Sequence, residues 1–257
     1  MKRTSISYGL GHSQVADIWR PTDREGDRPV VALIHGGFWK QLYTKRLMHR
    51  MAAAVVAHGW VAYNIEYRRV GHLGHGGWPE TFEDIAGALN ALNDVEGIDR
   101  QRVVTCGHSA GGHLALWAAT SRFTTSAAPS DPSLRVCAAI SLAGVVDLVA
   151  ASQLGLGGGA VDALLGGSPV EFPERYALGS PAAQLPLGVP QFLLHGTADT
   201  TVPASLSANY VEAAVAAGDE ATFIPLPGAS HMDMISPSGA AFQQVTAILD
   251  RFSSTLR

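Results

Sequence analysis

Residues 103–114 read VVTCGHSAGGHL, a short apolar run that leads into a serine bracketed by glycines. The apolar run predicts a buried strand, and the apolar residues after the glycines predict a helix. Ser109 therefore sits in a G-x-S-x-G turn between a strand and a helix, the arrangement called a nucleophile elbow. Gly107 and Gly111 have no Cβ, so the two backbones approach closely and Ser109 is forced into a strained conformation. We expect its hydroxyl at the carboxyl end of the strand, beside the free amides of the helix N-terminus.

A second glycine pair follows an apolar run upstream, in residues 30–39, VVALIHGGFW. A strand that is apolar at every position is covered on both faces, as in a parallel α/β sheet. We expect the bare backbone after this strand to place the amides of Gly37 and Phe38 in the same crevice as Ser109. Together with the amide of Ala110 they form a predicted oxyanion hole, the donor set that acyl transfer needs. An ordinary strand-to-helix turn is the alternative interpretation.

Two further strands end in residues that complete a triad. Residues 190–199, PQFLLHGTAD, predict a buried strand that leads to Asp199. Residues 221–231, ATFIPLPGASH, predict a last strand whose following loop carries His231. The chain order Ser109, Asp199, His231 differs from the orders in the chymotrypsin and subtilisin folds and is the order of α/β-hydrolases.

These segments resemble the small esterase, lipase and formamidase branch of the α/β-hydrolases, over nearly the whole chain. Residues 35–39, HGGFW, are similar to the H-G-G-x-W oxyanion segment of that branch, which includes arylformamidases and feruloyl or acetyl-xylan type esterases. Residues 107–112, GHSAGG, resemble its elbow, and residues 195–199, HGTAD, are similar to the acid loop shared with prolyl-oligopeptidase-like relatives. Residues 231–235, HMDMI, resemble the ending of arylformamidases. The resemblance implies the fold and the triad more firmly than the substrate, because this branch cleaves esters, thioesters and some amides with one machinery.

Other residues near these motifs are less specific. Asp147 also follows a predicted strand and is an alternative partner for His231. Asp233 lies too close to His231 in the sequence to orient it, and it fits a solvated or capping role. His72 and His75 have no paired cysteines or carboxylate cluster beside them, so neither a catalytic metal nor a cofactor is expected. We expect four residues to line the substrate pocket or pack beneath it: Trp39, Tyr67, Trp78 and His108.

Strands and helices alternate along the chain, which predicts an α/β fold with a mostly parallel central sheet and helices on both faces. Residues 6–19 are expected to add one or two antiparallel edge strands. With 257 residues and 47% hydrophobic content, the chain can bury one large core, so residues 1–257 are expected to form a single α/β-hydrolase domain. Residues 147–187 are rich in glycine and proline and fit neither a strand nor a long helix. We expect them to form a short cap over the site.

Composition limits the partners. Acidic residues exceed basic residues by 22 to 18 and no run of Lys or Arg occurs, so neither nucleic acid nor a membrane surface is expected as a partner. No stretch approaches the ~20 apolar residues of a spanning helix, and no apolar signal segment follows the charged N-terminus, so a cytoplasmic location is expected. Cys106 and Cys137 fall in predicted buried strands, where a lone cysteine behaves as a small hydrophobe. The oligomeric state stays open, a homo-oligomer being one alternative.

The expected activity is hydrolysis of carboxylic esters, short-chain or aryl, through an acyl-enzyme on Ser109. One alternative is an amide hydrolase of the arylformamidase kind with the same triad. A prolyl-oligopeptidase-like peptidase and a non-catalytic protein that binds a small ligand are further alternatives. The intact Ser109, Asp199 and His231 argue against the last of these, because a receptor needs no nucleophile. The motifs do not encode which acyl group or which leaving group is used.

Overall fold

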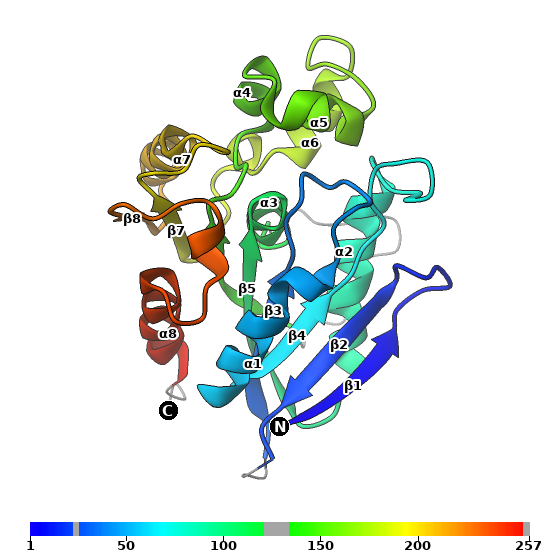
Figure 1. The fold of residues 1–257 in the computed structure, drawn as a ribbon, viewed down its shortest axis with the longest axis vertical. Helices are drawn as coiled ribbons and strands as arrows, with labels where there is room; N and C mark the ends of the chain where they lie inside the picture. The colour runs from blue at the N-terminus through cyan, green and yellow to red at the C-terminus, as the bar shows by residue number, and fades with distance from the viewer. Residues whose placement is uncertain (23–25, 121–133, 254–257) are drawn as a thin grey trace.

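The computed structural model describes residues 1–22, 26–120 and 134–253, which are organised around one eight-stranded sheet (Figure 1). The strands are β1 (Lys2–Ser7), β2 (Val15–Arg20), β3 (Arg28–Ile34), β4 (Val61–Ile65), β5 (Ile98–His108), β6 (Val136–Leu142), β7 (Gln191–Gly196) and β8 (Ala221–Leu226). They lie in the order β1-β2-β4-β3-β5-β6-β7-β8. β2 pairs antiparallel with both β1 and β4, and the other neighbouring pairs are parallel. The mostly parallel sheet with an antiparallel edge is the arrangement that the sequence predicts.

Helices cover both faces of this sheet (Figure 1). They are α1 (His49–Ala57), α2 (Glu80–Asn90), α3 (Ala110–Trp117), α4 (Leu148–Gln153), α5 (Leu156–Leu165), α6 (Pro173–Gly179), α7 (Ala204–Ala216) and α8 (Ala240–Ser253), with short 3-10 turns at η1 (Lys45–Met48), η2 (Ala91–Asp94), η3 (Pro181–Gln184) and η4 (Met232–Ile235). The buried residues of α1 and α8 pack in one core with Val31 and Leu33 of β3. Those of α2, α3 and α7 pack in a second core with Val30, Ala32 and Ile34. Because side chains alternate along a strand, a strand covered on both faces reads as a continuous apolar run.

Helix ends follow local signals in the sequence. Gly59 has a φ of +97°, a conformation that glycine adopts readily and that terminates a helix such as α1. α2 begins after Pro79, and its first turn contains Glu80 and Glu83 at the positive end of the helix dipole. The end of α1 and the start of α2 therefore coincide with these local signals.

Residues 147–187, here called the insertion, connect β6 to β7 and contain α4, α5 and α6. The insertion starts at the carboxyl end of β6 and lies at the top of Figure 1, away from both chain ends. Hydrogen bonds join it to the rest of the molecule. The Trp78 amide donates to Leu164 O at 2.8 Å, and His113 Nε2 lies 2.8 Å from Gly179 O. The insertion is thus made of short helices that are fastened to α3 and to the segment before α2.

The two cysteines lie on neighbouring strands. Cys106 on β5 is buried and Cys137 on β6 is partly buried, and both are free thiols. Burial raises the pKa of Cys106 to about 12 and that of Cys137 to about 11, so both stay protonated at neutral pH. Among the helices that the structure describes, none is both long and apolar enough to cross a membrane.

Candidate active site

Ser109 lies in a sharp turn between β5 and α3. Its φ of +57° and ψ of −119° are a strained combination for a residue with a side chain. The turn is held by the Ser109 amide, which donates to Leu142 O of β6 at 2.8 Å. A Cβ added to Gly107 would lie 2.0 Å from Gly111 O, and one added to Gly111 would lie 2.1 Å from Ile34 O. Only glycine fits at these two positions, which gives the G-x-S-x-G spacing its physical reason.

His231 and Asp199 are brought together from the loops that follow β8 and β7. His231 Nδ1 lies 2.7 Å from Asp199 Oδ2. The Asp199 side chain is fully buried and that of His231 is 12% exposed. Since a carboxylate only accepts, the proton lies on Nδ1, and Nε2 of His231 keeps a free lone pair.

The environment of Asp199 favours the carboxylate. Burial would raise the pKa of Asp199, but hydrogen bonds from His195, His231 and the amides of Val202 and Thr201 hold the pKa well below its usual range. The two amides lie 2.8 Å (Thr201) and 2.9 Å (Val202) from Oδ1. Asp199 is therefore ionised at neutral pH and holds the His231 ring through a charged acceptor.

His195 is a member of this cluster that the motif analysis did not single out. It is fully buried at the end of β7, and its Nε2 lies 3.2 Å from Asp199 Oδ2 and 2.9 Å from Val202 O. Its Nδ1 lies 2.8 Å from Ser207 Oγ. The spacing of four residues between His195 and Asp199 in HGTAD is the only local signal for this contact.

The other two aspartates considered from sequence have different partners. Asp147 caps α4, its Oδ1 accepting the Ala150 amide at 3.0 Å. Asp233 closes the loop of His231, its Oδ2 accepting the Ser230 amide at 2.8 Å and the Ser230 hydroxyl at 2.6 Å. Of the three aspartates, Asp199 contacts the His231 ring.

His108 links the elbow to the loop of His231. It directly precedes Ser109, and its Nε2 lies 3.0 Å from the backbone oxygen of His231. The rings of His108 and His231 are tilted, with centroids 4.6 Å apart. Burial, followed by the charge on His231, lowers the pKa of His108 to about 3. His108 is thus a neutral donor that holds the His231 loop beside the elbow.

The predicted oxyanion segment passes directly against the elbow. A Cβ added to Gly36 would lie 2.6 Å from His108 O and 3.0 Å from Cβ of Ser109. Gly37 and Phe38 have φ of +112° and +51°, so the backbone turns sharply after β3. This close approach requires glycine at position 36.

Three amides near Ser109 are available as donors. Gly37 and Phe38 lie in the turn after β3, and Ala110 is the first residue of α3, where an amide has no partner within the helix. Within the described parts of the chain, none of these three amides donates to another protein group. Amides of this kind satisfy an anion that forms on a bound ligand.

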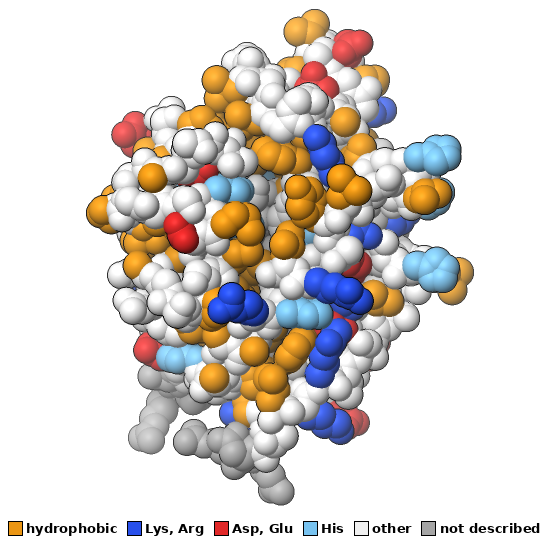
Figure 2. Space-filling view, viewed as in Figure 1, with side chains coloured by type: hydrophobic (Ala, Val, Ile, Leu, Met, Phe, Trp, Pro, Cys, Tyr) orange, Lys and Arg blue, Asp and Glu red, His pale blue; other side chains and the backbone are white. Residues whose placement is uncertain are grey.

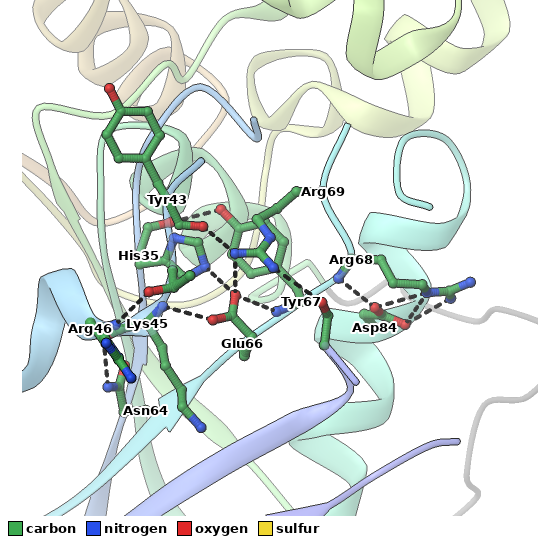
Figure 3. Close-up of polar contacts among 12 residues, drawn as sticks. His35, Tyr43, Lys45, Arg46, Asn64, Glu66, Tyr67, Arg68, Arg69 and Asp84 are labelled. Carbon is green, nitrogen blue, oxygen red and sulfur yellow. Dashed lines mark hydrogen bonds and ion pairs between the residues drawn. The ribbon is translucent and has the colours of Figure 1, made fainter. Parts of the chain in front are cut away.

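A buried network supports this segment from below (Figure 3). His35 Nε2 lies 2.9 Å from Glu66 Oε1, and Arg69 Nη1 lies 3.1 Å from the same oxygen. The Lys45 amide donates to Glu66 Oε2 at 3.0 Å. Burial opposes the charge, but the hydrogen bond and charge of His35 and the charge of Arg69 lower the pKa of Glu66 below its usual range. Glu66 is therefore a buried carboxylate that joins the end of β3 to the loops after β3 and β4.

We expect Glu66→Gln to lower the free energy of unfolding by about 3 kcal/mol at neutral pH, because it leaves the buried Arg69 charge without its carboxylate. Glu83→Gln is the matched control, since Glu83 is exposed and lies 3.7 Å from Arg68; its effect should stay within about 0.5 kcal/mol.

Urea unfolding over a pH series checks both. Because the folded-state pKa of Glu66 is lowered, its contribution is complete above the unfolded value of about 4.3 and is lost as pH falls through the folded pKa. Equal losses in Glu66→Gln and Glu83→Gln would contradict the assigned role.

The aromatic residues expected around a pocket lie mainly beneath the site. Trp39 and Tyr67 are fully buried. Trp39 packs edge-on against His113, and Tyr67 stacks on His35 with ring centroids 4.3 Å apart while its hydroxyl donates to His35 O at 2.9 Å. Both rings therefore pack within the core beneath the predicted oxyanion segment, which is the second of the two positions expected for them. Neither residue type nor position in a loop reveals that direction.

His108 and Trp78 differ in exposure. His108 is 2% exposed, and its side chain contacts the His231 loop through the bond to His231 O. Trp78 is half-buried beside Phe82, with ring centroids 5.0 Å apart, and its amide binds the insertion. Trp78 is the one of the four that keeps a partly exposed side chain.

The sequence matches a known family model over most of its length. Residues 16–213 match the model described as BD-FAE. The chain belongs to the BD-FAE family. With the eight-stranded sheet, this match confirms the α/β-hydrolase fold that the sequence predicts.

Named relatives of this BD-FAE family member include hydrolases of two kinds. It is 27% identical to Esterase LipC of Mycobacterium tuberculosis over 241 residues, which cover 89% of this chain and 59% of LipC. It is 30% identical to Kynurenine formamidase of Salmo salar over 115 residues, which cover 43% of this chain and 36% of that protein. The chain thus spans less than two thirds of the length of either relative.

Among solved structures, the BD-FAE chain is similar to the thermophilic esterase Est2 of Thermogutta terrifontis with propionate bound. The TM-score is 0.75 at 25% identity, and the match covers 97% of this chain and 92% of that chain. The similarity therefore extends over the sheet, the helices and the insertion together.

Proposed function

We propose that the protein is a serine hydrolase that cleaves carboxylic esters through an acyl-enzyme on Ser109. The observation that carries the proposal is the 2.7 Å contact of Asp199 Oδ2 with His231 Nδ1, in a loop that His108 holds beside the elbow. This contact leaves His231 Nε2 as the nitrogen that accepts the Ser109 proton.

In the first half-reaction, Ser109 Oγ bonds to the ester carbonyl carbon while its proton passes to His231 Nε2. The carbonyl oxygen becomes an oxyanion that accepts hydrogen bonds from the amides of Gly37, Phe38 and Ala110. The adduct then collapses by breaking the bond to the leaving-group oxygen, which takes the proton from His231. An alcohol leaves, and the acyl group stays on Ser109.

In the second half-reaction, water replaces the alcohol. His231 Nε2 takes a proton from water as its oxygen attacks the acyl carbon, and returns that proton to Ser109 Oγ as the acid leaves. The Asp199 carboxylate stabilises the imidazolium that forms in each half-reaction. His108 is neutral and adds no second positive charge beside the His231 imidazolium, which supports the role of His231 as the general base.

The surroundings of the site favour an apolar acyl or aryl group. Four exposed hydrophobic residues lie in segments next to the proposed machinery: Leu42, Tyr43, Leu154 and Met232. Figure 2 shows hydrophobic side chains gathered where the insertion meets the body of the molecule. The propionate in the similar Est2 esterase agrees with a short acyl group. We therefore propose short-chain or aryl esters as the substrate class.

Labelling with a fluorophosphonate tests the proposal. Such a probe phosphonylates a serine that an adjacent base activates. The purified protein should be labelled on Ser109, as found by peptide mapping, and should hydrolyse phenyl acetate and 4-nitrophenyl butyrate. Absence of labelling, or labelling on another residue, would contradict the proposal.

An arylformamidase-like activity is the second candidate, and the similarity to Kynurenine formamidase over 43% of the chain favours it. The same triad would then attack a formamide and release an aryl amine. An amide needs more protonation of its leaving group than an activated ester does. A formyl group carries only hydrogen on its carbonyl carbon, so it fits even a narrow acyl site.

We expect kcat/KM for phenyl acetate and 4-nitrophenyl butyrate to exceed that for N-formylkynurenine, measured under the same conditions. The reason is that a phenolate can leave with little protonation, whereas an amine must be protonated by the general acid before it leaves. If the formamide is preferred by about ten-fold, or about 1.4 kcal/mol in transition-state binding, the second candidate replaces the first.

A further inference from the structure

The insertion contains a run of glycines that the mechanism above does not use. Residues 155–159 read GLGGG. The four glycines, at positions 155, 157, 158 and 159, are all left-handed, with φ of +61°, +63°, +66° and +76°. Successive left-handed residues are costly when they carry a Cβ, and glycine avoids that cost. The run therefore forms a left-handed turn at the start of α5, here called the glycine turn.

The glycine turn contacts the oxyanion segment at one residue. A Cβ added to Gly157 would lie 2.5 Å from Cδ1 of Phe38. A Cβ added to Gly158 or Gly159 would meet nothing within 4 Å. The Phe38 ring is therefore packed against the backbone of Gly157, and a side chain at that position would displace the ring.

Lys40 fastens the same two segments. Its Nζ donates to Gly157 O at 2.8 Å, and its amide donates to Gly37 O at 3.0 Å. The amide bond closes the turn that contains Phe38, and the side chain ties this turn to the glycine turn. Phe38 is thus held by its own turn and by the insertion.

Phe38 depends on such support because of its backbone. Its φ of +51° is rare for a bulky residue, and a conformation of this kind persists only where the surroundings hold it. The amide that Phe38 offers to the oxyanion belongs to the same residue as the ring. Where the packed surroundings leave the ring no other rotamer, a shift of the ring is passed to the backbone of Phe38 and moves the donor as well.

We propose that the glycine turn is a positioning element for Phe38, which it holds through the ring contact at Gly157 and the Lys40 bond. The inference rests on the proposed function, since it concerns the oxyanion donor. The oxyanion forms only after the substrate has bound. Disturbing the turn at Gly157 therefore lowers kcat and leaves KM nearly unchanged.

The test compares Gly157→Ala with Gly158→Ala. Both glycines are left-handed, with φ of +63° and +66°, so alanine imposes a similar backbone cost at each. Gly157→Ala adds the cost of displacing the Phe38 ring, and thermal unfolding checks that both variants are folded at the assay temperature. Gly157→Ala should lower kcat for 4-nitrophenyl butyrate by at least about ten-fold at nearly constant KM, because the donor moves. The kcat of Gly158→Ala should stay within about two-fold of the wild-type value, because its added methyl group has no neighbour within 4 Å. Equal kcat values in the two variants would overturn the proposal.

A double-mutant cycle with Phe38→Ala tests whether the ring transmits the effect. In the Phe38→Ala background no ring remains to be displaced, so adding Gly157→Ala should change kcat by less than about two-fold. Full additivity of the two losses would mean that Gly157 acts by another route.

Lys40→Met and Lys40→Arg keep the test decisive if Gly157→Ala does not fold. Methionine removes the donor to Gly157 O and should lower kcat several-fold, whereas arginine keeps a donor and should restore most of it. Wild-type kcat in Lys40→Met would overturn the proposal. Fluorophosphonate labelling of the wild-type protein separates this outcome from failure of the proposed function. An unlabelled wild type contradicts the function itself, while a labelled wild type with unaffected variants contradicts only the positioning role.

Discussion

Replacing Ser109 with alanine should lower kcat/KM for phenyl acetate by at least about 10³-fold and abolish fluorophosphonate labelling. Alanine keeps the Cβ that the turn already accommodates, so the elbow stays folded and only the nucleophilic oxygen is lost. His231→Ala should cause a comparable loss, because an unactivated serine hydroxyl is a weak nucleophile at neutral pH. The double variant should be no worse than either single variant, since the residues act as a unit.

Ser141→Ala is the matched control for this prediction. Ser141 lies on β6 beside Gly107 of the elbow strand, and its hydroxyl is buried without a hydrogen-bond partner among the described residues. Removing it should change kcat/KM by less than about two-fold. Thermal unfolding of all variants checks that the fold is kept. Labelling and turnover that survive in Ser109→Ala would show that another residue is the nucleophile.

The elbow and the sheet are the parts of the molecule that the sequence predicts best. Gly107 is required by a backbone contact four residues along the chain, with Gly111, whereas Gly111 is required by a contact with Ile34 O on the neighbouring strand β3. The G-x-S-x-G motif nevertheless makes both glycines recognisable from the local sequence. The alternation of strands and helices predicts parallel strands, and the carboxyl ends of parallel strands meet at one edge of the sheet. That rule alone assigns Ser109, Asp199 and His231 to one region before any contact is known.

Contacts between distant segments are not predictable in this way. Glu66 is separated from His35 by 31 residues and from Lys45 by 21, and no motif marks the three as partners. The direction of a side chain in a loop is equally hidden, because loops lack the regular alternation of a strand. Tyr67 therefore packs beneath the oxyanion segment although its position in the sequence also fits a pocket wall.

Asp199→Asn should lower kcat/KM by about 10³- to 10⁴-fold through the tautomer of His231. Oδ1 of residue 199 accepts the amides of Thr201 and Val202, and an asparagine oxygen can keep both bonds. The NH₂ group then occupies the position of Oδ2, facing Nδ1 of His231. A donor there requires Nδ1 to accept, which moves the ring proton to Nε2. Nε2 can then no longer take the proton of Ser109.

Asp147→Asn is the matched control, because it makes the same chemical change at the other aspartate that follows a strand. Asp147 caps α4 through the Ala150 amide, and asparagine caps a helix about as well as aspartate. Its kcat/KM should therefore stay within about two-fold of the wild-type value. The pKa of Asp199 is held well below its usual range, so the wild-type carboxylate stays ionised over the whole working pH range, and acid titration does not mimic the amide substitution. If Asp147→Asn lost as much kcat/KM as Asp199→Asn, the assignment of Asp199 as the residue that orients His231 would be wrong.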